Sequence, residues 1–343
     1  MPWDKLLGHN RIKRILQKSI IEGRLPNAYC FYGVDGIGKD GLALEFAKTV
    51  NCSEPVRSDE SIEACGHCKS CREAEKMKHP NIHFIFPLPK GKTSDSNKDS
   101  ASAGLTDEQL ALIREHSLAK MEDPYHRISI PGADQIRIAS IREIKKKLKL
   151  SAARGGRIVV IISDFDRITP EAANAFLKTL EEPHSNVTII LTTSRVETLL
   201  PTIMSRCQQI HCESLPESLI SEELQSRFKM QESEAGIIAA WAQGSFSKAV
   251  DFMDEEIRQM RSDAVDMLRT SLKGKVFRKE LLEKIDNIIK NNDKQFLDNF
   301  LNTLLLWIRD ANLLNIYKDN TRIINTDQAE LLSKSIDNFG HCD

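Results

Sequence analysis

Gly33-Val34-Asp35-Gly36-Ile37-Gly38-Lys39 fits the pattern G-x-x-x-x-G-K and indicates the fold class of the first part of the chain. The apolar run 28–32 precedes it and predicts a buried strand, while residues 40–50 carry apolar side chains at helical spacing. A glycine-rich turn between a strand and a helix lets backbone N–H groups wrap a phosphate while the lysine reaches its outer oxygens. We therefore predict a phosphate loop with the candidate binding residues Gly33, Gly36, Gly38 and Lys39.

The position after Lys39 departs from the usual motif. Serine or threonine stands there in a phosphate loop, and its hydroxyl ligates Mg²⁺, whereas this chain carries Asp40. A carboxylate at that point repels the phosphate charge and should weaken MgATP binding, although it could instead ligate the metal. Asp40 is therefore a candidate member of an altered nucleotide site.

A second departure follows the β-branched run 158–162. An ATP-hydrolysing enzyme with a phosphate loop needs an aspartate near Mg²⁺ and a residue that orients water. The metal-binding position reads Ser163, and Asp164 stands where the catalytic glutamate is expected, with a shorter reach. Two departures on the same chemistry favour a chain that does not hydrolyse ATP and leave nucleotide binding open.

Alternating patterns predict an α/β domain followed by helices. Further strands are expected at 82–86, 158–162 and 187–191, and Thr169 before Pro170 predicts the start of a helix. Strands that alternate with helices indicate a parallel sheet with helices on both faces. Strand patterns disappear after about residue 213, and further helices are expected at 9–22, 107–120 and 134–150 and through the remaining C-terminal part.

Composition excludes several classes of protein. The 343 residues carry a formal net charge of −1, and only 6% are aromatic, which argues against a wholly basic nucleic-acid binder and a base-stacking surface. The apolar run 158–162 is far shorter than the roughly 20 residues of a membrane helix. Because residues 1–5 do not resemble a signal peptide, we expect a cytoplasmic protein.

Four of the eight cysteines, Cys52, Cys65, Cys68 and Cys71, follow the spacing C-x12-C-x2-C-x2-C. Short C-x2-C spacing lets thiolates reach one tetrahedral Zn²⁺, and four sulfur ligands make a closed, structural site. His67 is the alternative to Cys52 as a ligand. Reduced free thiols or a redox pair are the other interpretations.

A basic stretch at 137–157 contains eight lysines and arginines against the single acid Glu143. Its centre, Lys145, Lys146 and Lys147, is a candidate contact with a DNA backbone, which requires cations but no reading of bases. A solvated helix face is the plain alternative.

The chain resembles the clamp-loader AAA+ subunits of bacterial DNA polymerase III. The most diagnostic stretch is Asn174-Ala-Phe-Leu-Lys-Thr-Leu-Glu-Glu-Pro183, within a similarity that runs from Arg157. Leu7-Gly8-His9, the segment 25–29 and the Ser-Arg-Cys end of 200–207 fit as well. The resemblance covers residues 1 to about 250, and beyond that only the helical character and length match.

The resemblance implies a RecA-like AAA+ domain, a helical lid and a helical collar for oligomerisation. It also implies a hetero-pentamer with gamma/tau and delta subunits, in a DNA polymerase III holoenzyme, that opens the sliding clamp and sets it around primer–template DNA. A zinc module lies at the same place in this family. The expected divisions are 1–212 with a zinc module at 52–71 and an insertion at 87–130, then 213–255, then 256–343.

Further residues take candidate roles from the resemblance. Arg206 corresponds to an arginine that reaches the ATP of the neighbouring subunit, where a trans arginine stabilises transition-state charge; an ordinary interface arginine is the alternative. Thr193, with Thr192 as the other candidate, matches the sensor 1 position. Lys248 matches the sensor 2 position, where arginine is usual, but a solvated lysine fits equally well.

Within the family, Asp40, Ser163 and the length favour the delta-prime members, which do not hydrolyse ATP, over the gamma/tau motor. The alternative is a gamma/tau-like ATPase in which Asp40 or Asp164 ligates the metal. A zinc-containing AAA+ protein of DNA repair is a third possibility.

Overall fold

Five parallel strands in the order β4-β5-β6-β1-β7 organise the first part of the chain. They are β1 (Ala28–Tyr32), β4 (Ile82–Ile85), β5 (Ile158–Ile162), β6 (Val187–Thr193) and β7 (Gln208–His211). Every pairing between them is parallel, with Ile162 opposite Leu191 and Phe31 opposite Thr192. The carboxyl ends of the strands therefore lie at one edge, where open α/β sheets bind their ligands.

The computed structural model describes residues 3–91, 101–148, 156–182, 186–253, 255–272, 277–291, 294–319, 323–325 and 328–339. It divides into two compact units, one of residues 1–215 with 245–247 and one of residues 216–244 with 248–343. The boundaries expected at 212 and 255 stay predictions. Lys149, Arg154 and Pro183 lie outside the described residues, as does part of the insertion.

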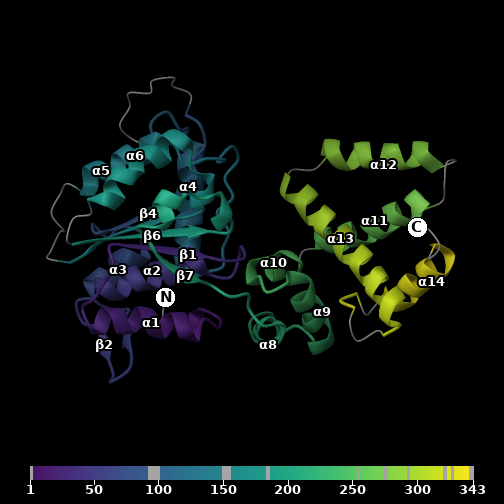
Figure 1. The fold of residues 1–343 in the computed structure, drawn as a ribbon, viewed down its shortest axis with the longest axis horizontal. Coiled ribbons are helices and arrows are strands. Elements are labelled where there is room, and N and C mark those ends of the chain that lie inside the picture. Colours follow the sequence, from purple (N-terminus) through teal and green to yellow (C-terminus); the bar gives the residue numbers. More distant parts are fainter. Residues whose placement is uncertain are drawn as a thin grey trace. The chain divides into compact units, whose positions relative to one another are not determined.

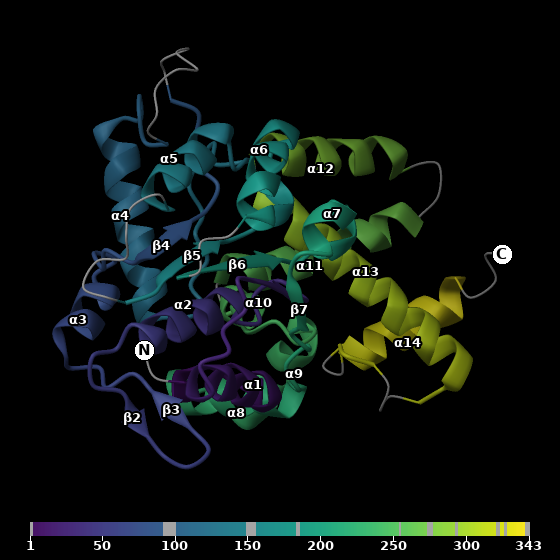
Figure 2. The same ribbon diagram turned by 60° about the vertical axis from the view of Figure 1, so that its left-hand side comes forward.

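Helices cover both faces of the sheet, as expected (Figure 1). On one face lie α1 (Asn10–Ile21), α2 (Lys39–Val50) and α3 (Lys69–Glu75), and on the other α5 (Ile138–Leu148) and α6 (Pro170–Glu181). Helix α4 (Asp107–Glu122) stands beside the edge strand β4 (Figure 2). The parallel sheet with helices on both faces is the predicted RecA-like α/β class.

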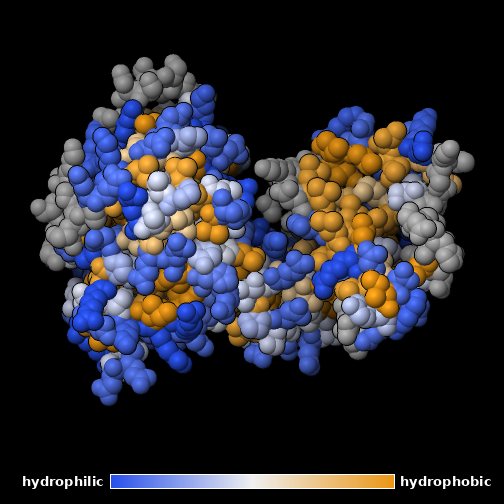
Figure 3. Space-filling model, in the orientation of Figure 1, coloured by the Kyte–Doolittle hydropathy of each residue, from blue (hydrophilic) through white to orange (hydrophobic). Residues whose placement is uncertain are grey.

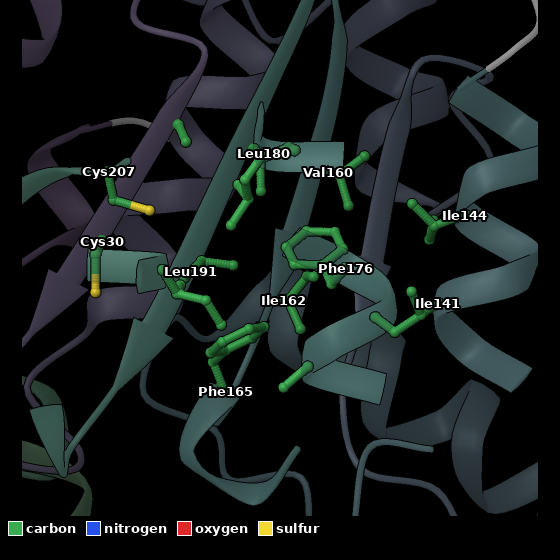
Figure 4. Close-up of a cluster of buried hydrophobic side chains, with 14 of the residues drawn as sticks. Cys30, Ile141, Ile144, Val160, Ile162, Phe165, Phe176, Leu180, Leu191 and Cys207 are labelled. Carbon is green, nitrogen blue, oxygen red and sulfur yellow. The ribbon is translucent and has the colours of Figure 1, made fainter. Parts of the chain in front are cut away.

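Side chains from β5, β6, α5 and α6 form the main hydrophobic core (Figure 4). Every residue of β5 is buried, which explains its uninterrupted apolar sequence, because a central parallel strand is covered on both faces. Phe165 and Phe176 pack with their ring centroids 5.9 Å apart. This core fixes the strand ends that carry the candidate site.

Helix starts follow the sequence signals. Thr169 caps α6 by accepting a hydrogen bond from the backbone N–H of Ala172, with Pro170 in the first turn. Thr106 and Gln109 form a capping box at the start of α4, so the helix expected at 107–120 is confirmed. The strands at 28–32, 82–86, 158–162 and 187–191 are confirmed within two residues.

Several short elements were not predicted. Among the described residues they are the edge strand β7, the hairpin of β2 (Val56–Arg57) and β3 (Ile62–Glu63), the helix α7 (Pro201–Met204), and 3-10 turns at Trp3–Lys5, Phe165–Arg167 and Val196–Thr198. Helix α3 was not predicted either.

The described residues of the second unit form helices and the segments between them, with no strand among them. Its helices are α8 (Glu217–Phe228), α9 (Glu232–Ala242), α11 (Glu255–Leu272), α12 (Arg278–Asn291), α13 (Lys294–Tyr317), α14 (Ala329–Phe339) and most of α10 (Phe246–Asp251). The buried Asp310 on α13 accepts hydrogen bonds from the backbone N–H groups of Ile324 and Asn325. This carboxylate ties α13 to the segment that leads into α14.

One face of α13 is apolar and exposed. Leu301, Leu305 and Ile308 are spaced along one side of the helix and are all exposed, and Leu282 and Ile289 on α12 are exposed as well. Figure 3 shows a broad hydrophobic area on this unit. Within the part of the chain that the structure describes, no helix is both long and apolar enough to cross a bilayer.

Candidate functional site

The phosphate loop connects β1 to α2, as the motif requires. Gly36 and Gly38 have positive φ angles of 76° and 95°, which favour glycine. Lys39, only 8% exposed, folds back and donates hydrogen bonds to the carbonyl oxygens of Gly33 (2.8 Å) and Val34 (2.7 Å). Two of the three donors of its ammonium group are therefore used inside the loop.

Both carboxylate oxygens of Asp40 accept hydrogen bonds from the chain. Ser163 donates from Oγ to Oδ2 at 2.8 Å, and Thr192 donates from Oγ1 to Oδ1 at 2.6 Å. The ammonium group of Lys120, on α4, lies 3.5 Å from Oδ2. Asp40, Ser163 and Thr192 thus meet at the ends of neighbouring elements, and Lys120 joins them from the insertion.

Residues Asp123–Arg127, which we call the covering segment, lie against the phosphate loop. A Cβ atom on Gly38 would be 3.0 Å from the Tyr125 ring, and one on Gly41 would be 2.5 Å from Pro124. The guanidinium group of Arg127 lies 3.0 Å from the Asp35 carboxylate. Burial raises the pKa of Asp35, but Arg127, Lys39 and Lys120 lower it more, so the pKa lies below its usual value.

The covering segment is itself held on two sides. The backbone N–H of Leu7 donates to the Tyr125 hydroxyl at 2.6 Å, and Ser247 donates from Oγ to the Tyr125 carbonyl at 2.6 Å. The rings of Tyr125 and Phe246 pack edge to face, 4.8 Å apart. Ser247 also donates its backbone N–H to the carbonyl of Gly36. These contacts fix the segment over the loop.

In this arrangement the chain's own groups make the contacts that MgATP would need. A bound nucleotide requires the lysine and the N-terminus of α2 to face its phosphates, and a hydroxyl to ligate Mg²⁺. Here Lys39 bonds to the loop, both oxygens of Asp40 have donors, and Tyr125 packs against Gly38.

The two candidate sensor threonines point in different directions, because neighbouring residues of a strand face opposite sides of the sheet. Thr192 contacts Asp40, whereas Thr193 donates from Oγ1 to Asp166 Oδ1 at 2.7 Å. Arg195 also pairs with Asp166, at 3.2 Å. The structure thus brings Thr192 to the phosphate loop, and it directs Thr193 to a separate contact.

Asp164 follows Ser163 in the left-handed conformation, with φ 51° and ψ 49°. Burial, followed by repulsion from Asp40, raises its pKa to about 6, although 41% of its side chain stays exposed. Arg167, at 3.8 Å, opposes the rise.

Arg206 is exposed at the end of α7. Its guanidinium group donates to the carbonyl of Thr202 at 2.7 Å and to Glu181 Oε1, at the end of α6, at 2.9 Å. Lys248 lies in α10 within the second unit. On α5, Lys147 pairs with Glu143 at 2.8 Å, Lys145 is half-buried, and Lys146 is exposed.

The sulfur atoms of Cys52, Cys65, Cys68 and Cys71 lie within 4.8 Å of one another. Four of their separations are 3.6, 3.6, 3.9 and 4.0 Å. Tetrahedral Zn²⁺ with Zn–S bonds of about 2.3 Å places its sulfurs roughly 3.8 Å apart, so the four cysteines fit this ion. Cys52 belongs to the cluster.

His67 does not join the four sulfurs. Its side chain is exposed. Its Nδ1 atom is hydrogen-bonded to the carbonyl oxygen of Cys65, and its Nε2 atom lies 3.5 Å from the Glu54 carboxylate. Backbone N–H groups of Cys65, Cys68 and Cys71 donate to cluster sulfurs at 3.3–3.4 Å, which stabilises thiolates.

Sequence reasoning missed Lys120, Tyr125 and Arg127. They lie in the insertion at 87–130, to which no motif assigned a role. The available signal was the aspartate at position 40, because a carboxylate buried beneath a loop requires a cation or several donors nearby.

The comparisons with known proteins agree with the similarity noted in the sequence. A family model described as DNA polymerase III, delta subunit, matches residues 8–216. The chain is 27% identical over 264 residues to DNA polymerase III subunit delta' of Pseudomonas aeruginosa, covering 76% of this chain and 66% of that protein. It is 28% identical over 214 residues to subunit delta' of Bacillus subtilis, covering 62% and 50%.

The chain is 22% identical over 297 residues to DNA polymerase III subunit tau of Escherichia coli, covering 85% of this chain and 39% of that protein. The chain thus spans less than two thirds of the length of each of these relatives.

Replacing Asp164 with asparagine should stabilise the chain at neutral pH. Because the pKa of Asp164 is raised on folding to about 6, the folded state binds the proton more tightly, and stability falls as pH rises from about 4 to about 6. Asparagine removes that charge and tolerates the left-handed conformation. We expect the Tm of Asp164→Asn at pH 7.5 to exceed that of the wild type by roughly 3 °C.

The gain in Tm should vanish near pH 4, where the side chain at position 164 is neutral in both the folded wild type and the folded variant. Asp134→Asn, an exposed acid in the same unit, serves as the control and should leave the Tm unchanged. A lower Tm for Asp164→Asn, or a gain that does not depend on pH, would contradict this assignment.

Proposed function

The chain belongs to the family of the DNA polymerase III delta subunit, and on that premise we propose that it is a delta-prime-type clamp-loader subunit that does not hydrolyse ATP. The observation that carries the proposal is the engagement of Asp40 by Ser163, Thr192 and Lys120. Asp40 stands at the metal-ligating position, and both of its carboxylate oxygens already accept hydrogen bonds from other side chains of the protein. Such a subunit would act as a scaffold beside the ATP-hydrolysing gamma/tau subunits and the delta subunit.

Arg206 is the residue that we assign to a neighbouring active site. An arginine that acts in trans must lie on the surface with its guanidinium group held in a defined direction. Exposure at the end of α7, together with the contacts to Glu181 and the Thr202 carbonyl, supports this assignment. If Arg206 is only an interface arginine, its loss should leave the ATP turnover of the assembled complex unchanged, and this distinguishes the two roles.

Assembly with the other subunits is proposed to use the second unit. The exposed apolar residues Leu301, Leu305 and Ile308 on α13 support a buried helix–helix contact in a hetero-pentamer, since surfaces of this kind mark interaction sites. In this proposal the pentamer works in the cytoplasm on primer–template DNA and the sliding clamp. Thr193 and Lys248 keep their proposed sensor roles only if the nucleotide site is functional.

The decisive experiment measures ATP turnover of the purified chain alone and after reconstitution with gamma/tau and delta subunits. We expect no turnover alone. In the complex, Arg206→Ala should lower ATP turnover about 10³-fold at the one active site that Arg206 completes. The total turnover of the complex should fall by the fraction that this active site contributes.

Arg24→Ala, at an exposed arginine of the same unit, is the matched control and should leave turnover unchanged. Robust turnover by the isolated chain would instead identify a gamma/tau-like motor. Unchanged turnover of the Arg206→Ala complex would remove the trans role.

Zinc is proposed to hold Cys52, Cys65, Cys68 and Cys71 together as a structural ion. Metal analysis of freshly reduced protein should find about one zinc per chain. Cys52→Ser should lower this content severalfold, whereas Cys30→Ala, at a buried cysteine outside the cluster, should not. Full zinc content in Cys52→Ser would exclude Cys52 as a ligand.

The basic centre of α5 is proposed to contact the DNA backbone. Changing Lys145, Lys146 and Lys147 together to glutamate should weaken DNA binding by the assembled complex. It should also reduce the slope of log affinity against log salt by about one for each phosphate that the variant no longer neutralises. The control is Lys178→Glu, at an exposed lysine on α6. An unchanged slope in the triple variant would identify a merely solvated helix face.

A further inference from the structure

The proposed function rests in part on the contact between Lys120 and Asp40 but does not say what the lysine does in the site. In a hydrolysing phosphate-loop protein, a hydroxyl after the lysine and a carboxylate at the end of the neighbouring strand together hold Mg²⁺. In this chain the two groups are exchanged: the carboxylate is on Asp40 and the hydroxyl is on Ser163. The site therefore keeps a negative charge suited to a cation.

We infer that the Lys120 ammonium group is the resident cation of this site and takes the position that Mg²⁺ occupies in hydrolysing relatives of the fold. Its Nζ lies 3.5 Å from Asp40 Oδ2 and donates to the carbonyl of His126 at 2.8 Å. The side chain is nearly enclosed, with 7% of the residue exposed. A buried ammonium group and a largely buried carboxylate are each costly to leave without the other.

The contacts around Lys120 explain how one helix can carry this cation. Lys120 lies in the last turn of α4, and the covering segment follows directly. Pro124 packs on Gly41, Tyr125 on Gly38, and Arg127 pairs with Asp35. The eight residues from Lys120 to Arg127 thus place two cations and an aromatic ring on the loop, where a nucleotide would bring Mg²⁺ and phosphates.

The inference deepens the proposed non-hydrolysing role and rests on it, because it names what fills the site. Its tests measure stability and cation binding of the full chain. Turnover of the wild type tests the proposed function separately. If the wild type hydrolyses ATP, that role fails; if the wild type is inactive but the pair shows no coupling, only the inference fails.

A double-mutant cycle measures the pairing. We expect Lys120→Met and Asp40→Ser each to lower the Tm by roughly 5 °C, since each leaves one buried charge unpaired. The double variant should lose clearly less than the sum of the two, because both charges are gone. Arg114→Met, which removes an exposed charge from the same helix, is the matched control and should change the Tm by less than about 1 °C.

Manganese binding tests the cation position and remains informative if one of these variants folds poorly. Lys120→Ala should bind one Mn²⁺ in paramagnetic resonance titrations at least tenfold more tightly than the wild type, with Asp40 as a ligand. The variant Asp40→Asn/Lys120→Ala should lose that gain. Mn²⁺ prefers oxygen ligands and therefore does not compete for the cysteine cluster. Additive Tm losses, or equal Mn²⁺ binding by Lys120→Ala and the wild type, would overturn the inference.

Discussion

A carboxylate enclosed beneath the phosphate loop is the constraint on which the site depends. Asp40 is held between the loop and the sheet, and a charge at that depth is stable only with donors or a cation around it. The two hydroxyls of Ser163 and Thr192 and the ammonium group of Lys120 meet that need. Because Lys120 lies in the last turn of α4, this contact also links α4 and the covering segment to the phosphate loop.

The sheet makes the arrangement possible because its register is fixed. Ile162 on β5 stands opposite Leu191 on β6, so the next residues, Ser163 and Thr192, emerge side by side at the carboxyl end. Thr192 is also paired with Phe31 on β1, whose strand leads into the phosphate loop. A slip of one residue would turn Thr193 toward the loop and Thr192 away. The buried, β-branched run of β5 prevents such a slip.

Much of this could be predicted from the sequence, for physical reasons that differ between elements. Strand β5 and helix α6 were predicted closely because burial on both faces and a Thr-Pro cap leave strong local signals. Strand β7 was missed because it lies at the edge of the sheet and three of its four residues are exposed, so its sequence is polar. Cys65, Cys68 and Cys71 were grouped by their close spacing alone, whereas the fold was needed to place Cys52 beside them across a 12-residue gap.

The contact of Lys120 with Asp40 could not be predicted from local sequence patterns, since 79 residues lie between the two and no motif contains both. What the sequence does record is an exchange of a hydroxyl and a carboxylate between positions 40 and 163, and an exchange conserves the charge of a site. A site that keeps its negative charge and loses its metal-ligating hydroxyl still needs a cation. A lysine fixed in the chain supplies that cation permanently, so the charge balance of the site does not depend on a bound nucleotide and its metal ion. Such a site is consistent with a subunit whose exposed Arg206 is proposed to serve the active site of a neighbour.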